Sequence, residues 1–265
     1  EKSRALEAAT AELRAANEQL KELDRLKDEF LSTMTHELRT PLTSIRAFTE
    51  ILHHNPDLDQ QRRDKFLGII LKENERLTRL IGQVLDLAKI ESGAMDWNLS
   101  EVDLAAVVQE SAVSMSQVCQ ENGVDLEIEV PSSVPPLAVD RDRMMQVLLN
   151  LLSNAVKFCR GGEGWVRVRL AREADRLQVS VEDNGPGIEP SLREVVFERF
   201  RQLADSGGHS PNGSGLGLPI SRQIVSHFGG RMWVEGGSRG GARFCFCLPL
   251  ADREPPIHSI GSDHD

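Results

Sequence analysis

An uninterrupted helical pattern at the start of the chain most constrains its fold. Apolar residues step alternately by three and four positions, the a/d spacing of a coiled coil, at Leu6, Ala9, Leu13, Ala16, Leu20 and Leu23. Neither glycine nor proline separates this segment from the helical pattern that follows, so a rotation or register shift in the first part could reach the second. We therefore predict a coiled-coil helix over residues 1–30; a simple dimerisation segment is the alternative.

The next helical segment carries a histidine on its outer face. Its apolar face consists of Leu31, Met34, Leu38, Leu42, Ile45 and Leu52. At about 100° per residue, His36 lies roughly 160° from both Met34 and Leu38. The spacing therefore predicts that His36 points away from the core, either as a solvated surface histidine or as a functional group.

The neighbours of His36 favour a functional role. Pro41 lacks an N–H, so the carbonyl of Glu37 loses its helical partner, and an interior helix proline costs about 3 kcal/mol. A distortion of that cost beside an exposed titratable group suggests a use, for which a hinge is one hypothesis. Glu37 can accept a proton or orient the imidazole, and Thr40 lies on the same face as His36.

A second long helix completes a helical domain over residues 31–92. The first helix is predicted to end near the turn-rich segment 53–57, and the second near Ser92 and Gly93. The inner face of the second helix consists of Phe66, Ile70, Leu77, Leu80, Val84 and Leu87. Two amphipathic helices cannot bury their apolar faces alone, so we expect a homodimer with a four-helix bundle.

After a predicted linker at 93–103, the pattern changes to mixed α/β over residues 104–250. Helices are expected from Asp103 to about Asn122, over 141–159 and over about 216–228. Strands are expected over 124–130, 165–171, 177–182, 231–235 and 242–248. The fold class is thus multi-domain, an all-α hairpin followed by an α/β two-layer sandwich, with a disordered tail at 251–265.

Composition excludes some classes of function. The formal charge of −10 argues against non-specific nucleic-acid binding, which needs a basic surface. No apolar run is long enough to cross a membrane. The four cysteines, Cys119, Cys159, Cys245 and Cys247, lack zinc-site spacing, so we expect small buried residues in a reducing compartment.

Three elements of the second domain point to a nucleotide. Asn150, Asn154 and Lys157 share one helix face, where amide oxygens suit Mg²⁺ and a lysine suits phosphate. The segment 183–188 follows a strand, with Asp183 placed to accept a hydrogen bond from an exocyclic amine. The segment 213–218 opens a helix whose N–H groups attract phosphate. Between the second and third of these elements, residues 201–212 could form a mobile lid over a ligand.

Together these residues resemble the sensor histidine kinases of two-component signalling. The segment around His36 resembles the family's H-box, 150–157 its N-box and 183–188 its G1 box. The run Phe197-Glu198-Arg199-Phe200 resembles the F-box, and 213–218 the G2 box. The likeness runs from about residue 30 to 250, with all five motifs in the family's order. It implies a dimerisation and phosphotransfer domain followed by an ATP-binding domain of the Bergerat type.

The resemblance also implies roles for individual residues. His36 would take the γ-phosphoryl group of ATP, with Glu37 as base or orienting group, and Thr40 would align water for dephosphorylation of the partner. Asn154 would bind Mg²⁺ with Asn150 beside it, and Asp183 would read the adenine amine. The remaining residues implied at the nucleotide are Lys157, Phe158, Gly185, Gly187, Ile188, Arg199, Arg201, Gln202, Gly213, Ser214, Gly215, Leu216 and Gly217.

Two positions depart from the family's usual pattern. Phe158 stands where many members have tyrosine, and Arg201-Gln202 stands where many have an aromatic residue followed by arginine. Which of Arg199, Arg201 and Gln202 contacts the γ-phosphate stays open. Related ATPases of this fold carry a glutamate at the position of Asn150, and an amide cannot act as the base that activates water. This difference favours transfer to His36 over hydrolysis.

The resemblance implies an autophosphorylating kinase that passes phosphate to an aspartate on a response-regulator receiver domain. A scaffold that dimerises and binds nucleotide without chemistry is the alternative, and phosphatase activity toward the regulator is a further possibility. We expect the cytoplasmic portion of a bacterial protein whose N-terminal sensor region lies outside this chain. Whether the full-length protein is anchored in a membrane stays open.

Overall fold

The computed structural model divides into a helical unit, which runs to Asp86, and an α/β unit, which begins at Leu87. It describes the chain except residues 1, 160–161, 200, 202–213 and 251–265, and except some side chains before Leu31. The predicted tail, most of the predicted lid and most of the coiled-coil side chains therefore lie outside the described residues.

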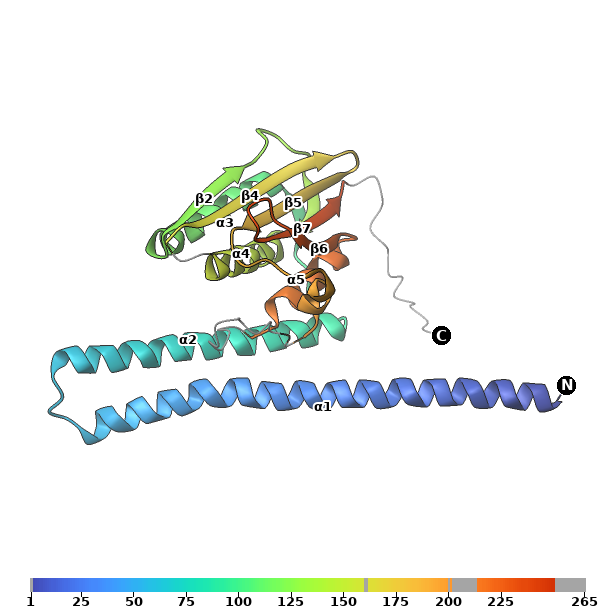
Figure 1. Cartoon of the computed structure of the whole chain (residues 1–265), viewed down its shortest axis with the longest axis horizontal. Helices are drawn as coiled ribbons and strands as arrows, with labels where there is room; N and C mark the ends of the chain where they lie inside the picture. The colour runs from blue at the N-terminus through green and yellow to red at the C-terminus, as the bar shows by residue number, and fades with distance from the viewer. Residues whose placement is uncertain (1, 160–161, 200, 202–213, 251–265) are drawn as a thin grey trace, which may run out of the picture. The chain divides into compact units, whose positions relative to one another are not determined.

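The helical unit is a hairpin of two long helices. Helix α1 spans Lys2–His54 and α2 spans Gln60–Glu91, its last turn extending beyond the boundary of the unit. Helix α1 continues through Pro41 without a break, and Figure 1 shows that it bends in its C-terminal part. The turn between the helices lies where the histidine-, asparagine- and proline-rich segment predicts it. No helix in the described part of the chain combines the length and apolarity needed to cross a bilayer.

The α/β unit contains a mixed sheet of five strands, in the order β2-β4-β5-β7-β6. The strands are β2 (Val124–Glu129), β4 (Gly164–Glu173), β5 (Arg176–Asp183), β6 (Arg231–Gly236) and β7 (Ala242–Pro249). Strands β2 and β4 are parallel, and the other pairs are antiparallel. Helices α3 (Leu104–Glu121), α4 (Arg141–Phe158) and α5 (Gly217–His227) cover one face of the sheet (Figure 1). This is the predicted two-layer sandwich.

Aspartates fix the starts of two of these helices. The Asp103 carboxylate accepts a hydrogen bond from the N–H of Ala105 at 2.9 Å, and Asp140 accepts from Asp142 and Arg143 at 3.0 and 3.1 Å. Side-chain oxygens at this position satisfy N–H groups that the first helical turn leaves without partners. Gly123 follows α3 with a φ of +65°, as expected for a residue that ends a helix.

The predicted linker is more ordered than its sequence suggests. Residues Leu99–Val102 form strand β1, which pairs antiparallel with β3 (Leu137–Asp140). The Trp97 ring stacks on His227 of α5, with centroids 3.8 Å apart and planes at 9°. The sequence analysis did not predict β1, β3 or the short 3-10 helices η1 (Pro190–Leu192) and η2 (Val195–Phe197). These elements are three or four residues long, too short for a clear periodic pattern.

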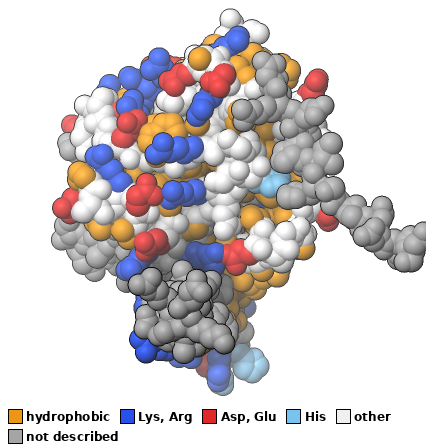
Figure 2. All heavy atoms as spheres, turned by 90° about the vertical axis from the view of Figure 1, so that its right-hand side faces the viewer, with side chains coloured by type: hydrophobic (Ala, Val, Ile, Leu, Met, Phe, Trp, Pro, Cys, Tyr) orange, Lys and Arg blue, Asp and Glu red, His pale blue; other side chains and the backbone are white. Residues whose placement is uncertain are grey.

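The face of the sheet opposite the helices carries charged residues in alternating order. One row across the five strands reads Glu127, Arg167, Glu182, Arg243 and Glu235. Arg167 pairs with Glu127 at 2.9 Å, and Arg243 with Glu235 at 2.8 Å. On the surface drawn in Figure 2, positive and negative side chains are likewise interspersed.

The four cysteines are free thiols. Cys119, Cys245 and Cys247 are buried, as expected, whereas Cys159 is half-buried. Burial raises the pKa of Cys245 to about 12, and the neighbouring Glu235 carboxylate adds to the rise. Cys245 therefore stays a neutral thiol near pH 7.

Candidate functional site

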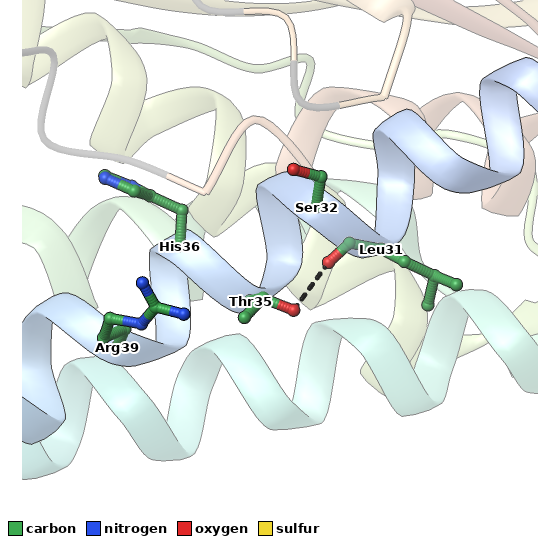
Figure 3. A pocket seen from close by; sticks show the side chains of 5 residues that line it. All are labelled: Leu31, Ser32, Thr35, His36 and Arg39. Carbon is green, nitrogen blue, oxygen red and sulfur yellow. Dashed lines mark hydrogen bonds between the residues drawn. The ribbon is translucent and has the colours of Figure 1, made fainter.

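The first group of predicted site residues lies on the outer face of α1. His36 is exposed, as its helical position predicts, and it lines a shallow hollow of about 340 Å³ together with Leu31, Ser32, Thr35 and Arg39. Figure 3 shows that His36 and Ser32 point away from α2. An exposed imidazole beside a hydroxyl and a guanidinium can receive a phosphoryl group without rearrangement of a core.

Two threonine hydroxyls form hydrogen bonds to backbone carbonyls of α1 close to His36. The Thr40 hydroxyl donates to the carbonyl of His36 at 3.2 Å, and the Thr35 hydroxyl donates to the carbonyl of Leu31 at 2.8 Å. Such bonds to the preceding turn tend to bend a helix. The bond to His36 lies one residue before the carbonyl of Glu37, which Pro41 leaves without a helical partner.

Glu37 faces α2, about 100° around α1 from its neighbour His36. Its Oε2 accepts from Nη2 of Arg76, on α2, at 3.2 Å, and both side chains are half-buried. The described structure contains no hydrogen bond between Glu37 and His36. The structure thus gives Glu37 a partner that the sequence analysis did not anticipate.

The second group lies at the C-terminal end of β5 in the α/β unit. Asp183 is 3% exposed, and its Oδ1 accepts from the N–H groups of Gly185 and Ala242 at 2.8 and 3.2 Å. Burial raises the pKa of Asp183, and the two N–H donors oppose that rise. With Oδ1 held by the backbone, Oδ2 is the oxygen available to an amine of a ligand.

Glycines around Asp183 allow other backbone segments to approach it. A Cβ on Gly185 would collide with the carbonyl of Phe158. Gly187 has a φ of +75°, and its missing Cβ would lie 2.9 Å from the carbonyl oxygen of Gly240. Gly241 packs directly on Asp183, and the sequence analysis missed it. The pair Gly240-Gly241 immediately before a strand was the signal that could have revealed it.

Asn150 joins α4 to α5. Its Nδ2 donates to the hydroxyl of Ser221 at 3.0 Å, and its Oδ1 faces Gly217 so closely that a Cβ there would collide with it. Ser221, which is 1% exposed, was not predicted as a site residue. On the same face of α4, Asn154 is half-buried and Lys157 exposed, with the Lys157 ammonium 4.6 Å from the Phe158 ring centroid.

The structure describes most of the other residues predicted at the nucleotide. Leu216 is fully buried and Gly215 has a φ of +65°, immediately before α5, whereas Ser214 and Ile188 are half-buried. Arg199 forms an ion pair with Glu91, and burial lowers its pKa, whereas Arg201 pairs with Glu198 at 3.1 Å. Gln202, Gly213 and Phe200 of the predicted F-box lie outside the described residues.

Two family models match this chain. Residues 26–93 match the family model of the His Kinase A (phospho-acceptor) domain. Residues 139–252 match that of the histidine kinase-, DNA gyrase B- and HSP90-like ATPases. The chain belongs to the histidine kinase family.

Curated relatives cover nearly the whole chain. Sensor histidine kinase AruS of Pseudomonas aeruginosa is 37% identical over an alignment of 268 positions, which covers 98% of this chain and 27% of the relative. Hybrid signal transduction histidine kinase D of Dictyostelium discoideum is 37% identical over 250 residues, 92% of this chain and 16% of the relative. This histidine kinase chain thus spans about a quarter or less of the length of these relatives.

Solved structures support the fold. Full-length ShkA in complex with AMPPNP has a TM-score of 0.63 and 31% identity, covering 86% of this chain and 47% of that one. Histidine kinase ThkA in complex with the response regulator TrrA has a TM-score of 0.64 and 26% identity, covering 83% and 61%. The α/β unit of this histidine kinase is accordingly an ATP-binding domain.

Proposed function

We propose that this chain autophosphorylates His36 with ATP and passes the phosphoryl group to an aspartate of a response-regulator receiver domain. The observation that carries the proposal is an exposed His36, within a segment that matches the phosphoacceptor family, in a chain that also holds the buried aspartate and glycines of an ATP-binding domain. The complex of the related ThkA with a response regulator supports a receiver domain as the partner.

The reaction requires one attack and one proton transfer. The lone pair of an imidazole nitrogen forms a bond to the γ-phosphorus, and the bond from that phosphorus to the bridging oxygen breaks, so ADP leaves with the electron pair. The ring becomes cationic and returns to neutrality when its other nitrogen gives a proton to a base. Glu37, the next residue in the chain, is the base that we propose.

Asp183 and the glycines around it are proposed to hold the nucleotide. The free Oδ2 of Asp183 would accept from the adenine amine, while Gly185, Gly187, Gly215 and Gly217 let the backbone approach the ligand. Lys157, at the exposed end of α4, supplies positive charge for the phosphates.

A magnesium ion fits the amide oxygen of Asn154 better than that of Asn150. Mg²⁺ binds oxygen ligands and would neutralise charge on the phosphates. Asn154 is half-buried on the face of α4 that carries Lys157. Asn150 uses its amide between Ser221 and Gly217, so we assign it mainly to joining α4 and α5.

A homodimer is proposed on the exposed apolar side chains of the hairpin. Leu13, Leu31, Leu42, Leu71 and Leu85 are 72, 51, 52, 62 and 56% exposed in the single chain. Soluble proteins rarely leave rows of such side chains in water. A second copy would cover them in a four-helix bundle extended by the coiled coil.

The test is labelling with γ-labelled ATP. The proposal predicts acid-labile, base-stable label on the wild-type chain and none on His36→Gln, because glutamine lacks the nucleophilic nitrogen. Label that persists in His36→Gln would refute the assignment of His36. ATP binding without any label in the wild type would favour the nucleotide-binding scaffold.

A further inference from the structure

The ion pair between Glu37 and Arg76 connects the residue beside His36 to the second helix. It joins positions 39 apart in the chain, with Arg76 Nη2 3.2 Å from Glu37 Oε2. The two side chains are only 21% and 29% exposed. Partial burial shields the pair from water, so it holds its geometry better than a surface pair.

Arg76 also forms an ion pair with a second carboxylate, that of Glu73. Its Nη1 lies 3.8 Å from Oε2 of Glu73, one turn earlier on α2. That Glu73 oxygen is buried and has no hydrogen-bond partner among the described residues. Arg76 therefore compensates two neighbouring acidic groups, and its removal would leave both partly buried without the cation that faces them.

The ion pair with Arg76 uses only one of the two carboxylate oxygens of Glu37. Arg76 contacts Oε2, whereas Oε1 takes part in no hydrogen bond in the described structure. Neighbouring residues on a helix point about 100° apart, so His36 and Glu37 do not face each other by default. The position in which Arg76 holds the Glu37 carboxylate therefore determines whether Oε1 can reach the imidazole.

We propose that Arg76 is a positioning residue for the phosphoacceptor histidine. It fixes Glu37 through Oε2 and compensates its charge, so that Oε1 can accept the ring proton of His36 as the phosphoryl group arrives. The inference rests on the proposed function. It assigns Arg76 no contact with ATP, since it acts only through Glu37.

The experiment compares initial rates of autophosphorylation at saturating ATP. Arg76→Gln removes the charge and should lower the rate about tenfold, because Glu37 is no longer held. Arg76→Lys keeps the charge but loses the planar fork, and should recover part of the rate. The matched control is Arg79→Gln, an exposed arginine one turn later on α2, which should stay within about twofold of wild type.

A double variant separates positioning from general support of the hairpin. If Arg76 acts through Glu37, then Glu37→Gln with Arg76→Gln should be no slower than Glu37→Gln alone. The KM for ATP should not change in either Arg76 variant. A further loss in the double variant, or a wild-type rate in Arg76→Gln, would overturn the inference.

Failure of the proposed function has a different signature. In that case the wild-type chain carries no label on His36, whatever residue stands at position 76. Light scattering and thermal unfolding of each variant establish that the dimer and the fold are intact. Should Arg76→Gln not fold, the Arg76→Lys rate decides: a wild-type rate with the fork lost contradicts the inference, and a partial loss at unchanged KM supports it.

Discussion

The proposed phosphoacceptor face of α1 and the proposed nucleotide-binding end of the sheet are built in opposite ways. His36, Arg39 and Thr40 are exposed side chains on α1, and the side chains of His36 and Arg39 take part in no hydrogen bond in the described structure. Asp183 is 3% exposed, and glycines touch it where no side chain fits. On α1 the chemistry and the stability rest on different atoms, whereas at the end of β5 they rest on the same atoms.

The largest effect on stability should come from Gly217→Ala. The added methyl group would collide with the Asn150 amide, so α5 must move away from α4 or Asn150 must give up its bond to Ser221. Overpacking of this kind costs about 1–3 kcal/mol. We expect a lower melting temperature of the α/β unit and weaker ATP binding together, measured by calorimetry and by titration with a non-hydrolysed ATP analogue.

Gly82→Ala is the matched control for this substitution. Gly82 lies within α2, and nothing lies within 4 Å of the position its Cβ would take. Alanine is the better helix former by roughly 1 kcal/mol, so this variant should be slightly more stable than wild type. Equal melting temperatures for Gly217→Ala and wild type would contradict the close packing of α4 and α5.

Asp183→Asn should weaken ATP binding without lowering the stability of the α/β unit. The asparagine Oδ1 can still accept from Gly185 and Ala242, while the buried charge is removed. Its NH₂ group, however, would face the adenine amine as donor against donor. We therefore expect about a hundredfold weaker ATP binding with no loss of stability.

The difference in stability between Asp183→Asn and wild type should depend on pH, and the burial of Asp183 determines its direction. Burial raises the pKa of Asp183, so the folded chain holds that proton more tightly than the unfolded chain does. The wild type thus loses stability as the pH rises from about 4 through the folded pKa, whereas asparagine does not titrate. The melting temperature of the variant relative to wild type should rise between pH 4.5 and 7.5. A difference that shrinks over this range would contradict the assigned cause.

The two regions also differ in how far the sequence predicts them. Helical spacing places His36 on the outer face, because the direction of a side chain on a helix depends only on its angle around the helix axis, which the sequence position gives. The N-caps Asp103 and Asp140 and the five strands of the sheet follow from local patterns in the same way. These predictions need no knowledge of what packs against what.

The contacts that complete each site depend on tertiary packing instead. Arg76 lies 39 positions from Glu37, and Ser221 lies 71 positions from Asn150. Neither spacing carries a local signal, so both partners were missed. The strand β1 was missed for a related reason, since four residues pair with a strand nearly forty positions later. Only the packed structure brings these residues together.

The smallest effect on stability should come from Thr40→Ala on α1. Thr40 is exposed, and its hydroxyl contributes only a bond to the carbonyl of His36, so the unfolding free energy should change by no more than about 0.5 kcal/mol. If Thr40 aligns water, the variant should keep autophosphorylation and lose dephosphorylation of a phosphorylated receiver domain. Thr49→Ala is the matched control, because the Thr49 hydroxyl bonds the carbonyl of Ile45 in the same way at 2.7 Å. Loss of dephosphorylation in both variants would attribute it to the bend of α1, whereas its loss in Thr40→Ala alone would attribute it to the hydroxyl beside His36.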